Sequence, residues 1–217
     1  GVRGWGHPSI LHAIDDLARF QGGIVTHAQL VSLGMSPSTI SRWTRTGGHW
    51  QRLLPATYLV HRGTPTFDER LNAALLYAGQ QAELTGLGAL HLHGIRNLPT
   101  SPAELPLQVL LPHERHAKSA AFLTVERTHR LPDPVVRNGY PVVPVARALF
   151  DAGRRLDDRH LIRAFTLEAV QRRLTTVAEL RDEITDGQRQ WTAVLRDVVG
   201  DAAAGVMSNP EAGLRDL

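Results

Sequence analysis

Residues 36–48 read SPSTISRWTRTGG, and this stretch decides the fold of the N-terminal part of the chain. A serine followed by a proline is typical of a helix start, because the serine side chain caps free backbone N–H groups and proline fits the first helical position. Two glycines close the stretch and are typical of a helix end. The sequence therefore predicts a short helix from Pro37 to about Thr46.

The two faces of this helix differ in chemistry. Ile40 and Trp43 lie three residues apart, so they share a face that can pack into a core. No acidic residue occurs between Asp16 and Asp68. The opposite face carries hydroxyl groups and arginines, at Ser38, Thr39, Ser41, Arg42 and Arg45. A helix that reads DNA in the major groove needs such a face, because hydroxyl and guanidinium groups reach base edges and phosphates.

Two further helices are expected before this one and a hairpin after it. Residues 8–20 and 26–33 carry apolar side chains at helical spacing. Two short strands are expected over 50–54 and 57–60. This order of elements is the plan of a winged helix-turn-helix, which we assign to residues 1–62.

Formal charge is concentrated in the same N-terminal part. The chain has 24 Lys+Arg and 21 Asp+Glu, a net charge of +3. Residues 1–62 hold six arginines and two acids, a net of +4, whereas residues 63–200 hold 17 bases and 16 acids, a net of +1. Such asymmetry favours a polyanionic partner at the N-terminal end. Polar residues without acids continue into the hairpin, so the predicted DNA contacts also include His49, Gln51, Arg52 and Arg62.

Composition excludes several classes of protein. The chain has no cysteine, which excludes disulfide scaffolds, thiolate metal sites and cysteine nucleophiles and fits a reducing cytoplasm. No run of about 18 apolar residues occurs, and charges interrupt any signal-peptide core, so we expect a cytoplasmic chain without a membrane span. The chain starts with Gly1, and a new helix start at residues 208–211 lies close to Leu217, so both ends look like the borders of a fragment.

Residues 63–200 predict a mixed domain that is rich in helices. Strands are expected over 107–111 and 122–126, and Asn138-Gly139 predicts a tight hairpin between two further strands. Helices are expected over 67–80, 85–93, 144–155, 158–172, 176–185 and 189–199. Polar residues are expected to cap three of them, at Thr85, Asp157 and Thr176. The fold class is therefore α+β, with a winged helix-turn-helix followed by a mixed α/β domain.

No catalytic or metal-binding pattern is found in this second part. His91 and His93 lie two apart on an expected helix, so their side chains diverge, and HERH at 113–116 falls one residue short of the zinc-protease spacing; solvated or helix-capping roles fit these histidines better. GLGALH at 86–91 starts like a dinucleotide-binding loop, but His91 replaces its third glycine and no strand is expected before it. Several acids are expected on solvated helix faces beside arginines, among them Asp151, Glu168, Glu179 and Glu183. We therefore expect no metal, no cofactor and no enzymatic activity.

Residues 22–60, GGIVTHAQLVSLGMSPSTISRWTRTGGHWQRLLPATYLV, resemble the N-terminal winged helix of AbiEi-type antitoxins, the DNA-binding halves of type IV toxin–antitoxin systems. Three later segments fit actinobacterial members of this family: AALLYAGQQAELTGLGALHLHGI, YPVVPVARALFDAG and the final SNPEAGLRDL. The order of these segments carries the resemblance, which covers most of the chain. The chain departs from the family in the hairpin, where Pro55-Ala56 stands in place of a glycine, so a wing-tip contact is not implied.

The resemblance implies a transcriptional repressor that binds double-stranded DNA in its own toxin–antitoxin operon. It also implies a separate domain that counters a nucleotidyltransferase-like toxin without binding it tightly. In some longer relatives, a segment like SNPEAGLRDL opens a Vsr-like nuclease domain, and Glu211 would match the first acid of that fold. Residues 201–217 are thus expected to be the start of a truncated further element, and without the later metal ligands this chain is not expected to cut DNA.

Two alternatives to the repressor stay open from the sequence. One is the DNA-targeting part of a nuclease whose catalytic domain lies beyond Leu217. The other is a stand-alone regulator whose second domain responds to a ligand. An Asp and a Glu-x-Lys encoded after Leu217 would favour the first, and a neighbouring nucleotidyltransferase gene would count against the second.

Overall fold

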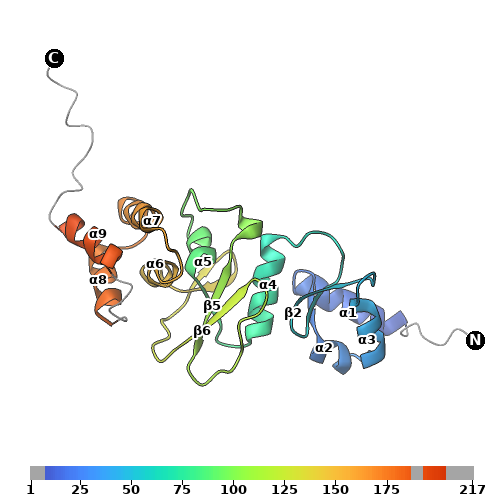
Figure 1. Cartoon of the computed structure of the whole chain (residues 1–217). Helices are drawn as coiled ribbons and strands as arrows, with labels where there is room; N and C mark the ends of the chain where they lie inside the picture. Colours follow the sequence, from blue (N-terminus) through green and yellow to red (C-terminus); the bar gives the residue numbers. More distant parts are fainter. Residues whose placement is uncertain (1–7, 187–192, 204–217) are drawn as a thin grey trace, which may run out of the picture. The chain divides into compact units, whose positions relative to one another are not determined.

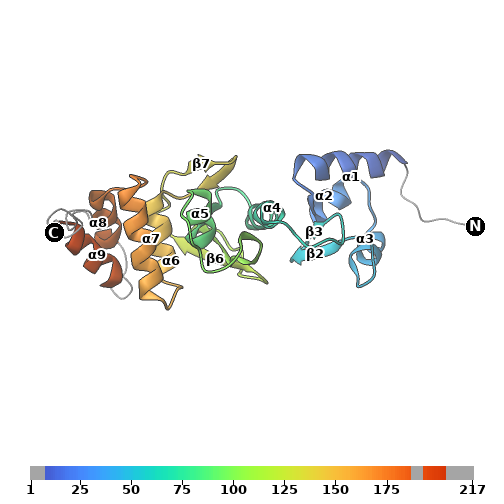
Figure 2. The same ribbon diagram turned by 90° about the horizontal axis from the view of Figure 1, so that it is seen from above.

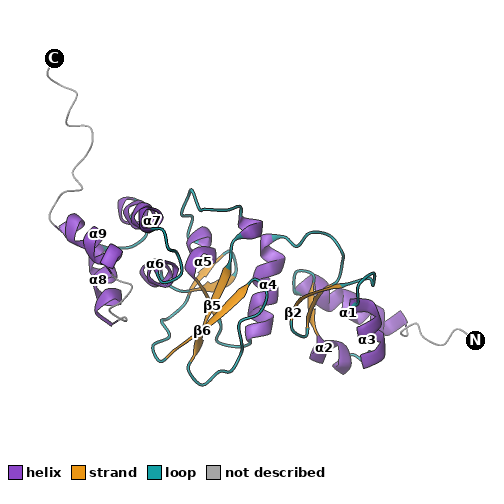
Figure 3. Ribbon diagram, in the orientation of Figure 1, coloured by secondary structure: helices purple, strands orange, loops and turns teal. Residues whose placement is uncertain are grey.

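The computed structural model describes residues 8–186 and 193–203, which form helices and sheets in the predicted α+β class (Figure 1, Figure 3). The chain folds into two compact units. The first combines the residues up to Leu84 with Thr100–Leu131, and the second combines Thr85–Pro99 with the residues from Pro132 onward. Each unit therefore contains segments that are far apart in the sequence.

The first unit begins with three helices and a small sheet. The helices are α1 (Pro8–Phe20), α2 (His27–Ser32) and α3 (Pro37–Thr44). The strands are β1 (Ile24–Thr26), β2 (Gln51–Leu54) and β3 (Thr57–Leu59), paired antiparallel in the order β1-β3-β2. The three helices and the hairpin β2–β3 are those predicted from the sequence, whereas β1 is not among the predicted strands.

Helix starts in this unit follow the capping signals. The Thr26 hydroxyl accepts from Gln29 N, and the Gln29 side chain accepts from Thr26 N, so the two residues cap α2 reciprocally. Ser36 caps α3 by accepting a hydrogen bond from Thr39 N, and Pro37 follows as the first helical residue. The predicted start of α3 is thus confirmed.

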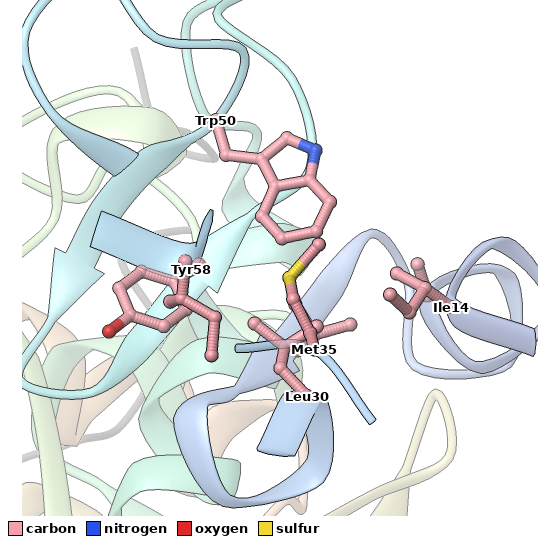
Figure 4. Packing of buried hydrophobic residues seen from close by; sticks show 8 residues of the cluster. Ile14, Leu30, Met35, Trp50 and Tyr58 are labelled. Carbon is pink, nitrogen blue, oxygen red and sulfur yellow. The ribbon is translucent and has the colours of Figure 1, made fainter. Parts of the chain in front are cut away.

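One core holds the three helices against one face of the small sheet. Figure 4 shows Met35 and, from α2, Leu30 between Tyr58 of β3 on one side and Ile14 of α1 on the other, with Trp50 next to Met35. The complete cluster of buried side chains is Ile14, Ala18, Val25, Leu30, Met35, Ile40, Trp50 and Tyr58. Because α3 contributes Ile40 to this core, the opposite face of α3 is turned outward.

The other face of the small sheet is covered by the next helix, α4 (Phe67–Ala78). Ile24, Leu54 and Leu59 are buried but lie outside the core just described, and α4 packs against the three strands that carry them. His61, just after the hairpin, places its Nε2 atom 2.7 Å from Glu69 Oε1 on α4. Helix α4 thus belongs to the same compact unit as the winged helix. The domain boundary predicted after residue 62 would separate the two, and it stays a prediction.

Helix α4 also packs against β5 (Leu107–Pro112), which pairs in parallel with β6 (Leu123–Thr128). Arg70 of α4 is buried there. Its guanidinium donates to Ala103 O and, at 2.7 Å, to Leu105 O, and lies 4.5 Å from the centre of the Phe122 ring. The buried guanidinium of Arg70 therefore links α4 to residues 103–105 and to Phe122, which lie more than 30 positions further along the chain.

A short strand, β4 (Glu83–Thr85), directly precedes α5 (Gly86–Leu92). The expectation that no strand comes before residues 86–91 is therefore wrong, and only His91 in place of the third glycine argues against a dinucleotide loop. Thr85 lies at the helix start as predicted, but its side chain makes no cap. Its hydroxyl instead donates to Asp151 Oδ2 at 2.6 Å, a contact across 66 residues of sequence.

The second unit is mainly helical. Besides α5 it contains the hairpin of β7 (Val135–Arg137) and β8 (Tyr140–Val142), in which Asn138 and Gly139 have φ values of 50° and 84°. These positive angles confirm the predicted tight turn. The later helices are α6 (Val145–Gly153), α7 (Arg159–Gln171), α8 (Val177–Asp186) and α9 (Ala193–Ala203). Helix α6 packs against α5, α7 and α8, and Figure 2 shows it alongside α7.

Two further predicted roles in this unit, those of Asp151 and Asp157, are wrong. The sequence places Asp151 on a solvated face, but its side chain is fully buried and receives hydrogen bonds of 3.1 and 3.0 Å from Arg147 Nε. The cap of α7 is Asp158 and not Asp157, whereas Thr176 does cap α8. Residues 187–192 and 204–217, which include Glu211 and part of the helix expected over 189–199, lie outside the described residues.

Candidate nucleic-acid interface

Helix α3 is anchored by one face. Ile40 is 1% exposed, and the half-buried Trp43 packs edge-on against the rings of Trp50 and His49, with centroids 4.7 and 5.3 Å away. These aromatic contacts hold the segment after α3 against the helix. Because α3 cannot turn about its axis without breaking them, its outward face is well defined.

The outward face carries the side chains predicted to contact DNA. The Ser36 hydroxyl lies 3.0 Å from the hydroxyl of Ser38 and 2.9 Å from that of Thr39, so the hydroxyl groups at the start of the helix are already ordered. The five predicted contacts of α3 and its C-terminal end are half-buried at Thr39 and exposed at Ser38, Ser41, Arg42 and Arg45. The structure thus brings these five residues together, and their contact with DNA stays a prediction.

A tight turn joins α3 to the hairpin. Trp50 N donates to Trp43 O at 2.9 Å, and Gly48 N donates to Arg45 O at 2.8 Å. A Cβ atom on Gly48 would lie 2.2 Å from Trp43 O, far inside van der Waals contact. Residue 48 therefore has to be glycine for the hairpin to return beside the end of α3 that carries Arg45.

Arg52 is the only charged residue in the hairpin, residues 51–59, and it is exposed. Its guanidinium carbon lies 5.8 Å from the centre of the Tyr58 ring, whose hydroxyl is 3.3 Å from His27 Nδ1. Arg52 is therefore oriented by a buried aromatic neighbour while its charge stays at the surface. At the tip, Pro55 and Ala56 offer no polar side chain to a partner.

Two of the predicted contacts have structural partners that the sequence does not signal. Gln51 Nε2 donates to His61 O at 3.1 Å and to Gly63 O at 2.7 Å, and Arg62 Nη1 donates to Trp50 O at 2.8 Å. Gln51 and Arg62 thus tie the end of the hairpin to its start. Their acceptors lie 10 to 12 residues away, beyond the reach of local sequence patterns.

Two acids close to the ends of the acid-free stretch, Asp16 and Glu69, have partners within the protein. Asp16 forms an exposed ion pair with Arg19 at 2.9 Å. Burial raises the pKa of Glu69, but hydrogen bonds from His61 and Thr66 outweigh it and hold that pKa below its usual value. Glu69 is therefore ionised at neutral pH beside His61, on the α4 side of the small sheet.

The second unit contains a cavity of about 400 Å³ whose wall includes His93, Arg147 and Glu183. His93 is the C-terminal cap residue of α5, one of the two roles predicted for it, but it is buried rather than solvated. Its Nε2 lies 2.8 Å from Val143 O, and burial lowers its pKa. Arg147 Nη1 lies 3.4 Å from Glu183 Oε1, in addition to the hydrogen bonds from Nε to Asp151. Arg147 and Glu183, two of the charged groups at this wall, are therefore partners of one another.

Within residues 8–186 and 193–203, no three histidine or acidic side chains gather as metal ligands would. In the same described residues, no helix is long and apolar enough to cross a membrane.

Comparisons with known proteins find similarity in sequence over residues 12–47 and similarity in fold over most of the chain. A sequence model described as "Transcriptional regulator, AbiEi antitoxin" matches residues 12–47, which confirms the resemblance to AbiEi-type antitoxins in that segment. The crystal structure of the RV2827C protein from Mycobacterium tuberculosis is similar, with a TM-score of 0.60 and 16% identity over 92% of this chain and 80% of that chain. At that identity the similarity shows a shared fold alone. No curated protein sequence matches the chain significantly.

Proposed function

We propose that the chain is a sequence-specific DNA-binding repressor of the AbiEi antitoxin kind, which regulates its own type IV toxin–antitoxin operon. The observation that carries the proposal is the outward face of α3, where hydroxyl groups and arginines stand on a helix whose other face is buried. The family match over residues 12–47 supports it, because that segment includes the whole of α3. Arginine and short hydroxyl side chains are suited to base edges in the major groove.

Five of the predicted contact residues are proposed to have three different roles. Arg42 and Arg45 are proposed to contact base edges, because guanidinium groups bind guanine through two hydrogen bonds. Arg52, the only charged residue of its hairpin, is suited to contact a phosphate. Such a contact would strengthen binding to all DNA sequences equally. Gln51 and Arg62, whose side chains already bind backbone carbonyls, position the hairpin.

The test is selection of binding sites by the full chain from random duplexes, followed by titration of variants on the selected site. We expect Arg42→Ala or Arg45→Ala to cost about 1–3 kcal/mol on that site and to relax the preference at one base pair. Arg52→Ala should weaken all duplexes equally. Arg159→Ala, an exposed arginine at the start of α7, is the matched control and should bind as wild type. A wild-type chain without sequence preference would contradict the proposal, as would unchanged affinity in all three variants.

The second part of the proposal assigns neutralisation of a nucleotidyltransferase-like toxin to residues outside the winged helix. The full chain carrying both Arg42→Ala and Arg45→Ala should then lose repression of the operon and still protect cells that express the neighbouring toxin gene. Growth rescue measured beside a promoter reporter separates the two activities. Loss of both together would overturn this division. We also propose that the chain is not an enzyme, and nicking of DNA in Mg²⁺ by the purified wild type, abolished by Glu211→Ala, would contradict that.

A regulator that responds to a small ligand is the second candidate, and the cavity in the second unit is the observation that favours it. A small molecule that both raises the melting temperature of the full chain and changes its affinity for the selected duplex would support this candidate. A compound that does only one of these would count against it.

A further inference from the structure

Basic side chains gather at one edge of the β5–β6 pair, outside the winged helix. The two strands are parallel, with Pro112 opposite Thr128, so the segments that follow them leave from the same edge. The first residues of these segments are His113 and His129, whose rings stack with centroids 3.9 Å apart. Residues that are far apart in the sequence therefore form one surface.

Hydrogen bonds hold the segment between the two strands in place. Tyr77 of α4 donates its hydroxyl proton to Lys118 O at 2.9 Å, and Ser119 Oγ accepts from Val125 N at 2.9 Å. Arg115 N closes a turn by donating to the last carbonyl of β5 at 3.0 Å. The side chains of Arg115 and Lys118 are exposed and project from a backbone that is fixed at both ends.

Positive charge dominates at this edge. The exposed charged residues of 112–130 are one acid, Glu114, and four bases, which gives a net charge of +3. The second acid of the stretch, Glu126, is buried. The four bases are Arg115, Lys118, Arg127 and Arg130, and three histidines lie among them at 113, 116 and 129. The near-neutral total of residues 63–200 hides this local excess.

We propose that this surface, the basic edge formed by residues 113–118 and 127–130, binds the phosphate backbone of the DNA to which the winged helix is bound. The inference rests on the proposed function and adds a second DNA-contacting surface to that of the winged helix. Cations alone suffice for phosphate contacts and carry no sequence information. A protein partner would instead favour an apolar anchor, and the large exposed apolar side chains of the described residues lie elsewhere, at Phe20, Val31 and Val136.

The test is the salt dependence of duplex binding by the full chain. Each phosphate contact contributes about −0.9 to the slope of log K against log salt, so the triple variant R115A/K118A/R127A should lower the slope magnitude by roughly 2–3. Its affinity should fall for the selected site and for unrelated duplexes by the same factor. The control R159A/R173A/R181A removes three exposed arginines of the second unit and should keep the wild-type slope. The variant R115K/R127K keeps the positive charge and should also show the wild-type slope.

The outcomes distinguish this inference from the proposed function. If the wild-type chain binds duplexes and R115A/K118A/R127A has the same slope, the basic edge does not contact DNA. That result would refute this inference and leave the proposed function standing. Retained DNA binding with loss of toxin neutralisation in this variant would assign the edge to a protein and would also overturn it. A slope reduced equally in the control would mean a general charge effect and would refute it. Failure of the wild-type chain to bind any duplex refutes the proposed function itself.

Discussion

Ending the chain at residue 62 should unfold the winged helix, although the sequence places a domain boundary there. The cut removes α4, which packs on the face of the small sheet that holds Ile24, Leu54 and Leu59. These side chains are 0, 1 and 0% exposed, and complete burial of each contributes about 1.5–3 kcal/mol. Together they amount to roughly 5–9 kcal/mol, as much as the whole stability of many small domains.

The assay compares chains that end at residues 62 and 80 by thermal melting followed at 222 nm and in the near-ultraviolet, where Trp43 and Trp50 report tertiary packing. The longer chain keeps α4 and the contact between His61 and Glu69, and we expect it to melt cooperatively. We expect the shorter chain to show a broad transition and no near-ultraviolet signal. A sharp transition in the shorter chain, within a few degrees of the longer one, would refute the role given to α4.

Three further changes test other parts of the structure. Asp151→Ala leaves the buried Arg147 without its main partner and should cost about 3–5 kcal/mol in chemical denaturation, whereas Asp151→Leu combined with Arg147→Met should cost less. Gly48→Ala forces a Cβ toward Trp43 O, so the turn after α3 must shift, and both the melting temperature and the duplex affinity should fall. Burial lowers the pKa of His93, so the unfolded chain takes up a proton that the folded chain excludes, and the free energy of unfolding should fall as pH drops below about 6.5. His93→Gln should flatten that part of the pH profile, and an unchanged profile would show that another group titrates there.

Much of the fold follows from local signals and can be predicted from them. The start of α3 at Ser36 and the tight turn at Asn138-Gly139 each depend on a few adjacent residues, and both are confirmed. Three-residue strands such as β1 and β4 carry no periodic pattern, because pairing with distant segments makes them strands. The burial of Asp151 depends on Thr85, 66 residues away, and is equally invisible to a helical pattern.

In the candidate site, too, some features can be predicted from local sequence and others depend on distant residues. The outward face of α3 can be predicted because Ile40 and Trp43 mark the buried side of one short helix. The backbone partners of Gln51 and Arg62 depend on the path of the chain after the hairpin. The basic edge depends on the parallel pairing of β5 and β6, which brings two loops together. The net charge summed over residues 63–200 is near zero and does not reveal this local positive charge.

Helix α6 has a consequence for hydrogen exchange. All eight residues from Val145 to Ala152 are buried, including the charged Arg147 and Asp151. Their amide hydrogens therefore have no route to solvent through fraying or through a wetted face, and exchange needs an opening that also separates Arg147 from Asp151. Deuterium uptake by this single helix should thus measure the free energy of opening of the second unit, even while its surface helices exchange freely.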